Sequence, residues 1–271
     1  MGELTSLIAI VGSLSFLMEF VDASIGMGYG TALAPILLIM GFAPLDIIPV
    51  ILLGQLSGGL VGGFSHYQLG NIKLDFRADE VIKRRLGGWG YLPKSDDAKV
   101  VFILLLCGII GAVIGVFLAV NIPALVLKGY IGIMVLGIGI IILLQKRIQH
   151  TSWRSIIGIG LLSSFNKGIS GGGYGPLVTG GQIISGRESK NAVGSTTLSE
   201  FGVCVVGFLS YLIIRGDICW WMAGAMVVGA VIAAPLAALT VKKINKSYLK
   251  IIIGVITVIL GVFTLLKVFV F

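Results

Sequence analysis

The sequence is poor in charged residues: Asp, Glu, Lys and Arg together make up 12% of its 271 residues. A soluble globular protein usually carries about 25% charged residues. Apolar residues account for 56% of the chain, and the mean hydropathy is +1.05. No polar stretch is long enough to fold by itself, so we expect one membrane domain.

Residues that build catalytic and metal sites are also scarce. There are two histidines, and the three cysteines (Cys107, Cys204 and Cys219) have no CxxC spacing, so no metal site is expected. The HExxH and Walker A motifs are missing, which argues against a zinc hydrolase or an ATP-driven machine. We therefore expect no enzyme activity and no cofactor.

The net charge of +8 would in another context suggest nucleic acid as a partner. Here the basic residues lie in short segments between apolar runs, where they orient a membrane protein. No basic face with interleaved aromatic residues is present. The expected partner is the lipid bilayer, and nucleic-acid binding is not expected.

Six apolar runs are each long enough to cross roughly 30 Å of hydrocarbon at about 1.5 Å per helical residue. They cover residues 44–66, 100–120, 123–144, 191–214, 218–241 and 248–266. Two further apolar segments, 6–41 and 153–186, are interrupted by glycine clusters. The expected fold class is an all-α integral membrane protein.

The chain also contains an internal repeat. Residues 20–30 (FVDASIGMGYG) align with residues 165–175 (FNKGISGGGYG) at an offset of 145, which also relates Gln55 to Glu200. Residues 111–114 (GAVI) match 229–232 at an offset of 118, because the second half lacks the hydrophilic loop 67–98. We interpret 1–145 as the first repeat and 146–271 as the second. Each consists of one broken segment and three spans, and together they form the single membrane domain.

The distribution of basic residues predicts how the two halves are oriented. Lys and Arg favour cytoplasmic loops. If each broken segment enters and leaves the membrane on the same side, 16 of the 20 Lys and Arg residues are cytoplasmic, including those of the loop 67–98. We therefore predict two inverted repeats, each a re-entrant broken hairpin plus three transmembrane helices. Both termini then lie outside the cell (plasma) membrane.

The glycine clusters are the strongest candidates for a binding site. Non-helical backbone inside a bilayer is tolerated where it is buried in protein or lines a wet cavity, and paired breaks in two halves indicate a transport site. The half-helices beginning near Thr31 and Pro176 would direct backbone N–H groups at a small anion. Close helix packing is the alternative role of these glycines. The substrate-binding residues predicted here are Gly26, Gly28, Tyr29, Gly30, Thr31, Lys167, Gly171, Gly172, Gly173, Tyr174 and Gly175.

Ionisable residues within apolar runs cost at least about 2.5 kcal/mol each unless they are paired or hydrated, which makes them functional candidates. Asp22 and Lys167 are equivalent in the repeat, and we predict that they form a buried ion pair or flank the substrate. Glu200, the counterpart of Gln55, is a protonatable group that would allow coupling to protons. A structural contact of Glu200 with Lys167 or a tyrosine is an equal alternative. Glu19 is a weaker candidate, expected close to a water-facing end.

These features resemble the TauE/SafE family of sulfite-exporter-like membrane proteins, whose halves each carry GxGGGxxxxP followed by an AxG[ST]-like stretch. Residues 168–176 (GISGGGYGP) and 191–201 (NAVGSTTLSEF) match this pattern, whereas the first half fits more loosely, with Met27 where the family often has glycine. The resemblance adds Ser195 and Thr196 to the binding residues. It implies transport of a small anion such as sulfite, a sulfonate or a related organic sulfur anion. We predict a secondary transporter working by alternating access; the alternatives are an anion channel or, less favoured, a membrane-embedded enzyme.

Overall fold

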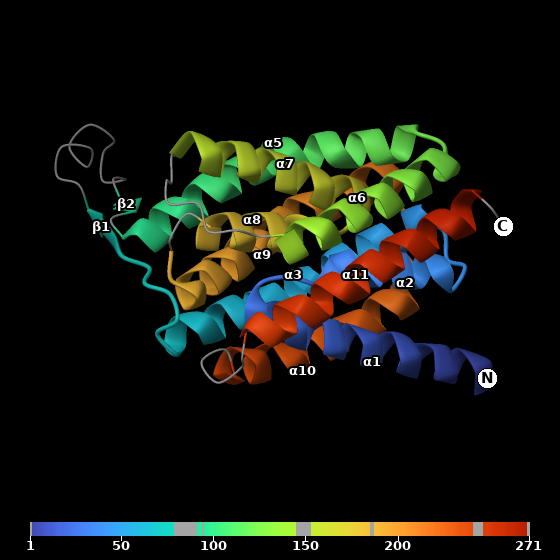
Figure 1. The fold of residues 1–271 in the computed structure, drawn as a ribbon, viewed down its shortest axis with the longest axis horizontal. Helices are drawn as coiled ribbons and strands as arrows, with labels where there is room; N and C mark the ends of the chain where they lie inside the picture. The colour runs from blue at the N-terminus through green and yellow to red at the C-terminus, as the bar shows by residue number, and fades with distance from the viewer. Residues whose placement is uncertain are drawn as a thin grey trace.

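The computed structural model describes residues 2–78, 91–93, 95–144, 153–184, 187–240 and 246–269, which form a bundle of long helices (Figure 1). The first part of the chain contains α1 (Gly2–Ile25), α2 (Tyr29–Ile39), α3 (Pro44–Gln68), α5 (Asp96–Asn121) and α6 (Ala124–Leu144). The second part contains α7 (Trp153–Ser170), α8 (Tyr174–Ile184), α9 (Ser189–Arg215), α10 (Trp220–Thr240) and α11 (Lys246–Phe269). The predicted all-α fold class is confirmed.

A short β ribbon accompanies the helices. The strand β1 (Phe76–Ala78) pairs antiparallel with β2 (Tyr91–Pro93), between α3 and α5. The ribbon lies at one end of the bundle (Figure 1). It belongs to the hydrophilic loop 67–98, of which residues 79–90 and 94 are outside the described part of the chain.

Local chemistry explains where several helices begin and end. Pro44 occupies the first turn of α3, where its missing N–H costs no helical hydrogen bond. The Ser95 hydroxyl accepts a hydrogen bond of 3.2 Å from the N–H of Ala98 and so caps α5. Helix α9 ends at Arg215 and is capped by Gly216, whose φ of 71° is in the left-handed region. The six predicted apolar runs correspond to α3, α5, α6, α9, α10 and α11.

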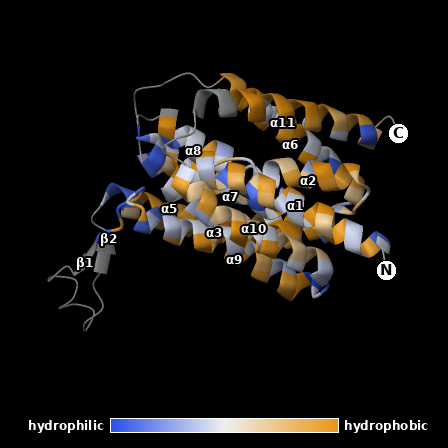
Figure 2. Ribbon diagram, turned by 90° about the horizontal axis from the view of Figure 1, so that it is seen from below, coloured by the Kyte–Doolittle hydropathy of each residue, from blue (hydrophilic) through white to orange (hydrophobic). Residues whose placement is uncertain are grey.

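The outside of the bundle is apolar, as Figure 2 shows for the outer faces of the helices. Large side chains such as Phe117 and Ile213 are 62% and 81% exposed. Within the described residues, seven helices are long and apolar enough to cross a membrane: the six expected ones and α1. The chain is therefore a multi-pass membrane protein.

The two broken segments form hairpins that open toward opposite ends of the bundle. Figure 1 shows that α1 starts at the end where both termini lie and that α2 returns to that end. A hydrogen bond of 2.6 Å from Lys267 Nζ to the Ile39 carbonyl joins the ends of α11 and α2 there. Helices α7 and α8 start and return at the other end, near the β ribbon. These directions are those that an inverted repeat predicts.

The hairpins are packed crosswise. Helix α1 packs along α10 and α7 packs along α5, so each hairpin lies against a helix from the other half of the chain. Between these pairs, α3 packs against α9, and α6 packs against α11. Exchanging corresponding helices of the two halves converts the α1–α10 pair into the α7–α5 pair and leaves the α3–α9 and α6–α11 pairs unchanged. This arrangement places the tips of both hairpins in the core of the bundle.

Candidate functional site

Both helices that were predicted to be broken are interrupted by three residues. Residues 26–28 separate α1 from α2, and residues 171–173 separate α7 from α8. The half-helices begin at Tyr29 and Tyr174, two residues earlier than predicted. Positive φ angles, which only glycine adopts without strain, occur at Gly26 (77°), Gly28 (137°), Gly171 (74°) and Gly173 (81°).

The two interruptions, called here the breaks, lie directly against each other. A Cβ atom on Gly30 would overlap the Gly171 carbonyl, and one on Gly172 would come within 2.9 Å of the Gly30 carbonyl. A Cβ atom on Gly175 would overlap the carbonyl oxygen of Gly26 in the first break. The N–H of Gly173 donates to Thr31 Oγ1 at 3.0 Å. The structure thus brings the two predicted glycine clusters together, and it also shows that these glycines permit close packing.

A row of buried polar side chains, called here the ionic row, lies beside the breaks. Gln55 Nε2 donates to Asp22 Oδ2 at 2.7 Å, and Lys167 Nζ donates to Gln55 Oε1 at 2.7 Å. Lys167 Nζ also donates to Glu200 Oε1 at 2.8 Å. Each of these four residues is at most 3% exposed. Of the two alternatives predicted for Asp22 and Lys167, the ion pair is wrong, because the Gln55 amide lies between them and Glu200 is the ionic partner of Lys167. That the two residues flank the substrate stays a prediction.

The ionic row consists of two pairs of equivalent positions. The offset of 145 relates Asp22 to Lys167 and Gln55 to Glu200. Each pair has one residue in the first half and one in the second. The observed hydrogen bonds connect all four side chains at the contact between the two halves. The contact between Glu200 and Lys167 is present, and coupling to protons through Glu200 stays a prediction.

The tyrosines that follow the breaks are anchored by serines from different helices. The Tyr29 and Ser15 hydroxyl oxygens are 2.9 Å apart, whereas the Tyr174 hydroxyl donates to Ser199 Oγ at 3.0 Å. Gly54 is the counterpart of Ser199 in the first half, and a Cβ atom there would overlap the Tyr29 hydroxyl. In each half a serine hydroxyl therefore forms a hydrogen bond with the buried tyrosine, but the two serines, Ser15 and Ser199, are not at equivalent positions.

The starts of the two half-helices differ in their electrostatics. Asp22 Oδ1 accepts a hydrogen bond of 3.3 Å from the N–H of Tyr29, so a carboxyl group already serves the start of α2. Lys167 occupies the equivalent position before α8. A helix N-terminus and an ammonium group both attract negative charge, whereas a carboxylate repels it. The start of α8 therefore has an ammonium group, paired with Glu200, at the position where the start of α2 has a carboxyl group.

Glu19 is buried, contrary to its predicted place near a water-facing end. Its residue is 1% exposed, and neither carboxyl oxygen has a hydrogen-bond partner among the described residues. Gly58 of α3 leaves space for it, since a Cβ atom there would lie 2.6 Å from the Glu19 carboxyl group. Glu19 thus lies in the core near the ionic row without being bonded to it.

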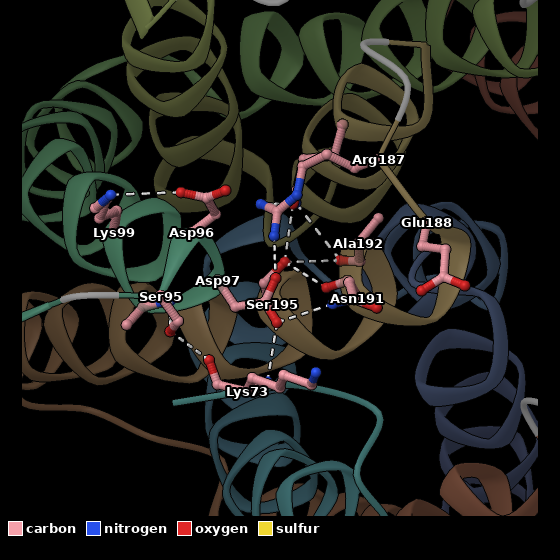
Figure 3. Close-up of polar contacts among 12 residues, drawn as sticks. Lys73, Ser95, Asp96, Asp97, Lys99, Arg187, Glu188, Asn191, Ala192 and Ser195 are labelled. Carbon is pink, nitrogen blue, oxygen red and sulfur yellow. Dashed lines mark hydrogen bonds and ion pairs between the residues drawn. The ribbon is translucent and has the colours of Figure 1, made fainter. Parts of the chain in front are cut away.

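Ser195 and Thr196 point to different parts of the structure. The Thr179 hydroxyl lies 2.7 Å from the Gly26 carbonyl and 2.9 Å from Thr196 Oγ1, which connects Thr196 to the first break. Ser195 Oγ instead lies 2.8 Å from Gln182 Oε1, in a network at the end of the bundle (Figure 3). Sequence reasoning missed Thr179 because no polar residue stands at the equivalent position of the first half.

A polar cluster, drawn in Figure 3, joins α5, α8 and α9. It lies at the end of the bundle where Figure 1 shows the β ribbon. The Arg187 guanidinium pairs with the Asp97 carboxylate and donates to Gln182 Oε1 at 2.8 Å. Asn191 Nδ2 and the N–H of Lys73 each donate to Asp97 Oδ2 at 2.9 Å. Asp97 therefore fastens the segment after α3 and the start of α9 to the start of α5.

A related contact lies at the opposite end. Arg215, at the end of α9, pairs with Asp46, at the start of α3, with an N–O distance of 2.7 Å. Asp46 is the counterpart of Asn191 at offset 145, and Arg215 is the counterpart of Asp97 at offset 118. Equivalent pairs of positions thus fasten the two ends of α9. The contacts of Asp97 with Arg187 and Asn191 at one end, and of Arg215 with Asp46 at the other, are called here the end latches. Sequence reasoning missed them because it considered charges inside apolar runs, whereas these charges lie at helix ends.

Apolar helices arranged around two helical hairpins whose broken tips meet inside the bundle are typical of secondary transporters. The structure thus defines the class of the protein as a membrane transporter.

Comparison with known proteins gives the family. The family model described as Sulfite exporter TauE/SafE matches residues 83–264, and the chain belongs to this family. Probable membrane transporter protein YtnM from Bacillus subtilis (strain 168) is 26% identical over 274 residues, which cover 96% of this chain and 82% of that protein. No solved structure matches the chain. The resemblance seen in the glycine motifs is therefore confirmed.

Proposed function

We propose that this transporter carries a small anion, namely sulfite, a sulfonate or a related organic sulfur anion, by alternating access around the two breaks. The observation that carries the proposal is the position of Lys167, which is 1% exposed and lies one turn before the second break. An ammonium group in the core, next to the start of a half-helix, provides positive charge and hydrogen-bond donors for a compact anion.

The substrate class is supported by the family and by the chemistry of the site. The matching family is described as that of sulfite exporters, while the name of the Bacillus relative gives no substrate. Sulfite and sulfonates present several acceptor oxygens on one sulfur atom, which suits a site of backbone N–H groups and one ammonium group. The absence of a Walker A motif from the sequence favours a gradient as the energy source.

The transport mechanism that we propose is a movement of two inverted repeats relative to each other. The opposite directions of the hairpins, their crossed packing and the equivalence of the end latches support this mechanism. In the described conformation both end latches are formed and the backbones of the two breaks touch. An anion can reach Lys167 only after one end opens, which favours a carrier over an open channel.

We infer the orientation from the basic residues. The end that contains the β ribbon also carries Lys73, Arg154, Arg187 and Lys190, so it is the cytoplasmic end. Both termini are then outside the plasma membrane.

The proposal is tested with purified protein in liposomes, by measuring uptake of sulfite, methanesulfonate and small carboxylates with and without a pH gradient. We expect saturable uptake of at least one sulfur anion. The variant Lys167→Met is expected to lose it, and Arg154→Ala, which changes an exposed residue on the same helix, is expected to keep it. If no small anion moves or stabilises the protein, the proposal is wrong, and flux that does not saturate identifies a channel.

A further inference from the structure

Glu19 is the acid of the described core whose carboxyl group accepts no hydrogen bond. Asp22 accepts hydrogen bonds from Gln55 and from a backbone N–H, and Glu200 accepts one from Lys167. The two oxygens of Glu19 have no hydrogen-bond partner in the part of the chain that the structure describes. An unpartnered carboxylate is costly at membrane depth, and a buried polar group without a partner requires a functional explanation.

The titratable groups that face Glu19 come from four helices. They are Asp22 of α1, Tyr29 of α2, Lys167 of α7, and Glu200 and Cys204 of α9. From α3 the Glu19 carboxyl group meets Gly58, which also borders Ala230 of α10, and α10 itself contains no titratable residue. If Glu19, Asp22 and Glu200 were all ionised, three carboxylates would lie near one ammonium group, that of Lys167.

The second half offers a natural comparison for Glu19. Its counterpart at offset 145 is Ser164, which is also fully buried and whose hydroxyl also has no partner among the described residues. The two positions share their burial and their lack of partners and differ in charge. Because the acid is present in one half only, a packing requirement common to both halves does not explain it.

On the basis of the proposed anion transport, we propose that Glu19 binds the proton that crosses the membrane together with the anion. The proton comes from the water on the side where the anion enters, and it is bound by one carboxyl oxygen of Glu19. It returns to the water on the other side when the anion has left. Glu19 is therefore a proton-binding residue of the transport cycle.

The charge of the core determines the direction of coupling. An anion that arrives next to Lys167 adds negative charge to a cluster in which carboxyl groups already outnumber ammonium groups. A proton on Glu19 removes one negative charge from this cluster. The anion and the proton therefore move in the same direction, one proton with each monoanion.

The experiment uses purified protein in liposomes with labelled methanesulfonate, which stays a monoanion at neutral pH and so cannot carry the proton itself. The membrane potential is held at zero. When the outside is one pH unit more acidic, one-to-one coupling supports an accumulation of up to about tenfold. We expect the wild-type protein to accumulate methanesulfonate in this way. The variant Glu19→Gln keeps the shape of the protonated acid but cannot release a proton; it is expected to lose accumulation and still exchange internal for external methanesulfonate.

The matched control is Ser164→Ala, which changes the equivalent buried position and is expected to keep both accumulation and exchange. Accumulation by Glu19→Gln at the wild-type level would overturn the inference, as would accumulation driven by sodium instead of protons. If Glu19→Gln loses both exchange and accumulation, the inference is also overturned, because the loss of both activities indicates a structural role.

A second measurement does not depend on the variant or on transport. Dicyclohexylcarbodiimide reacts with protonated carboxyl groups in apolar surroundings, and mass spectrometry identifies the modified residue. We expect modification of wild-type Glu19 that decreases at alkaline pH. Modification confined to Asp22 or Glu200 would contradict the inference. A wild-type protein that moves no anion but is modified at Glu19 would refute the proposed transport and leave Glu19 as a protonated group.

Discussion

Replacing Lys167 by methionine, which keeps most of the side-chain length and removes the ammonium group, is expected to destabilise the protein strongly. Lys167 is 1% exposed, and its Nζ atom donates to Glu200 at 2.8 Å and to Gln55 at 2.7 Å. Removing one partner of a buried ion pair costs roughly 3–5 kcal/mol, because the other charge stays buried without compensation. The free energy of unfolding is measured by SDS titration in mixed detergent micelles.

The double variant Lys167→Met/Glu200→Gln is expected to recover most of this loss. The remaining amide is neutral, and replacing both members of a buried ion pair by uncharged groups is often close to neutral for stability. Arg154→Ala serves as the control on the same helix, and its free energy of unfolding should change by no more than about 0.5 kcal/mol because its side chain is exposed.

Transport by the double variant separates the two roles of Lys167. If Lys167 binds the anion, the double variant is folded but does not take up methanesulfonate. Uptake at the wild-type rate would refute this role and leave the contact between Lys167 and Glu200 as a structural one. A single variant as stable as the wild type would refute the argument from burial itself.

Three more predictions concern the breaks, the end latches and the orientation. Gly30→Ala is expected to lower the free energy of unfolding by about 1–3 kcal/mol, because its Cβ would overlap the backbone of the facing break. Gly224→Ala, where the Cβ would meet open space, should leave the free energy of unfolding unchanged in the same titration. Equal effects of the two substitutions would contradict the observed contact. In a cysteine-free background, a disulfide between Asp46→Cys and Arg215→Cys is expected to stop transport until it is reduced, because the end of α9 cannot open; transport by the cross-linked protein would exclude an opening there. Gly2→Cys is expected to react with a membrane-impermeant maleimide added to intact cells, and labelling only after lysis would reverse the proposed orientation.

The long helices could be predicted from hydropathy alone because a membrane span needs a continuous apolar stretch of fixed minimum length. The predicted run 123–144, for example, corresponds to α6 (Ala124–Leu144). The glycine clusters located both breaks, since glycine is the residue that adopts the positive φ angles found there. The starts of α2 and α8 were predicted two residues late because the tyrosines that follow the breaks are already helical.

The residues of the ionic row could be predicted from the sequence, but the hydrogen bonds between them could not. Repeat equivalence identified all four residues of the ionic row, yet which group bonds to which depends on side-chain conformations that sequence offsets do not contain. The depth of Glu19 was misjudged because the apolar run gave no indication that α1 begins at Gly2 and reaches far into the bundle before residue 19. The end latches were missed because Asp97 and Arg187 look like ordinary solvated charges until α5 and α9 come together.

The crossed packing of the hairpins affects how the chain is made. Of the described helices, α1 leaves the ribosome before all the others, but α10, the helix along which it packs, is the last but one to be synthesised. Until then the polar side of α1, with Ser15, Glu19 and Asp22, lacks its final neighbours, and other helices or the insertion machinery must shield it from lipid. A chain divided between α6 and α7 would leave each fragment without the surface that covers its own hairpin. The two fragments would therefore have to assemble with each other inside the membrane before either could complete its fold.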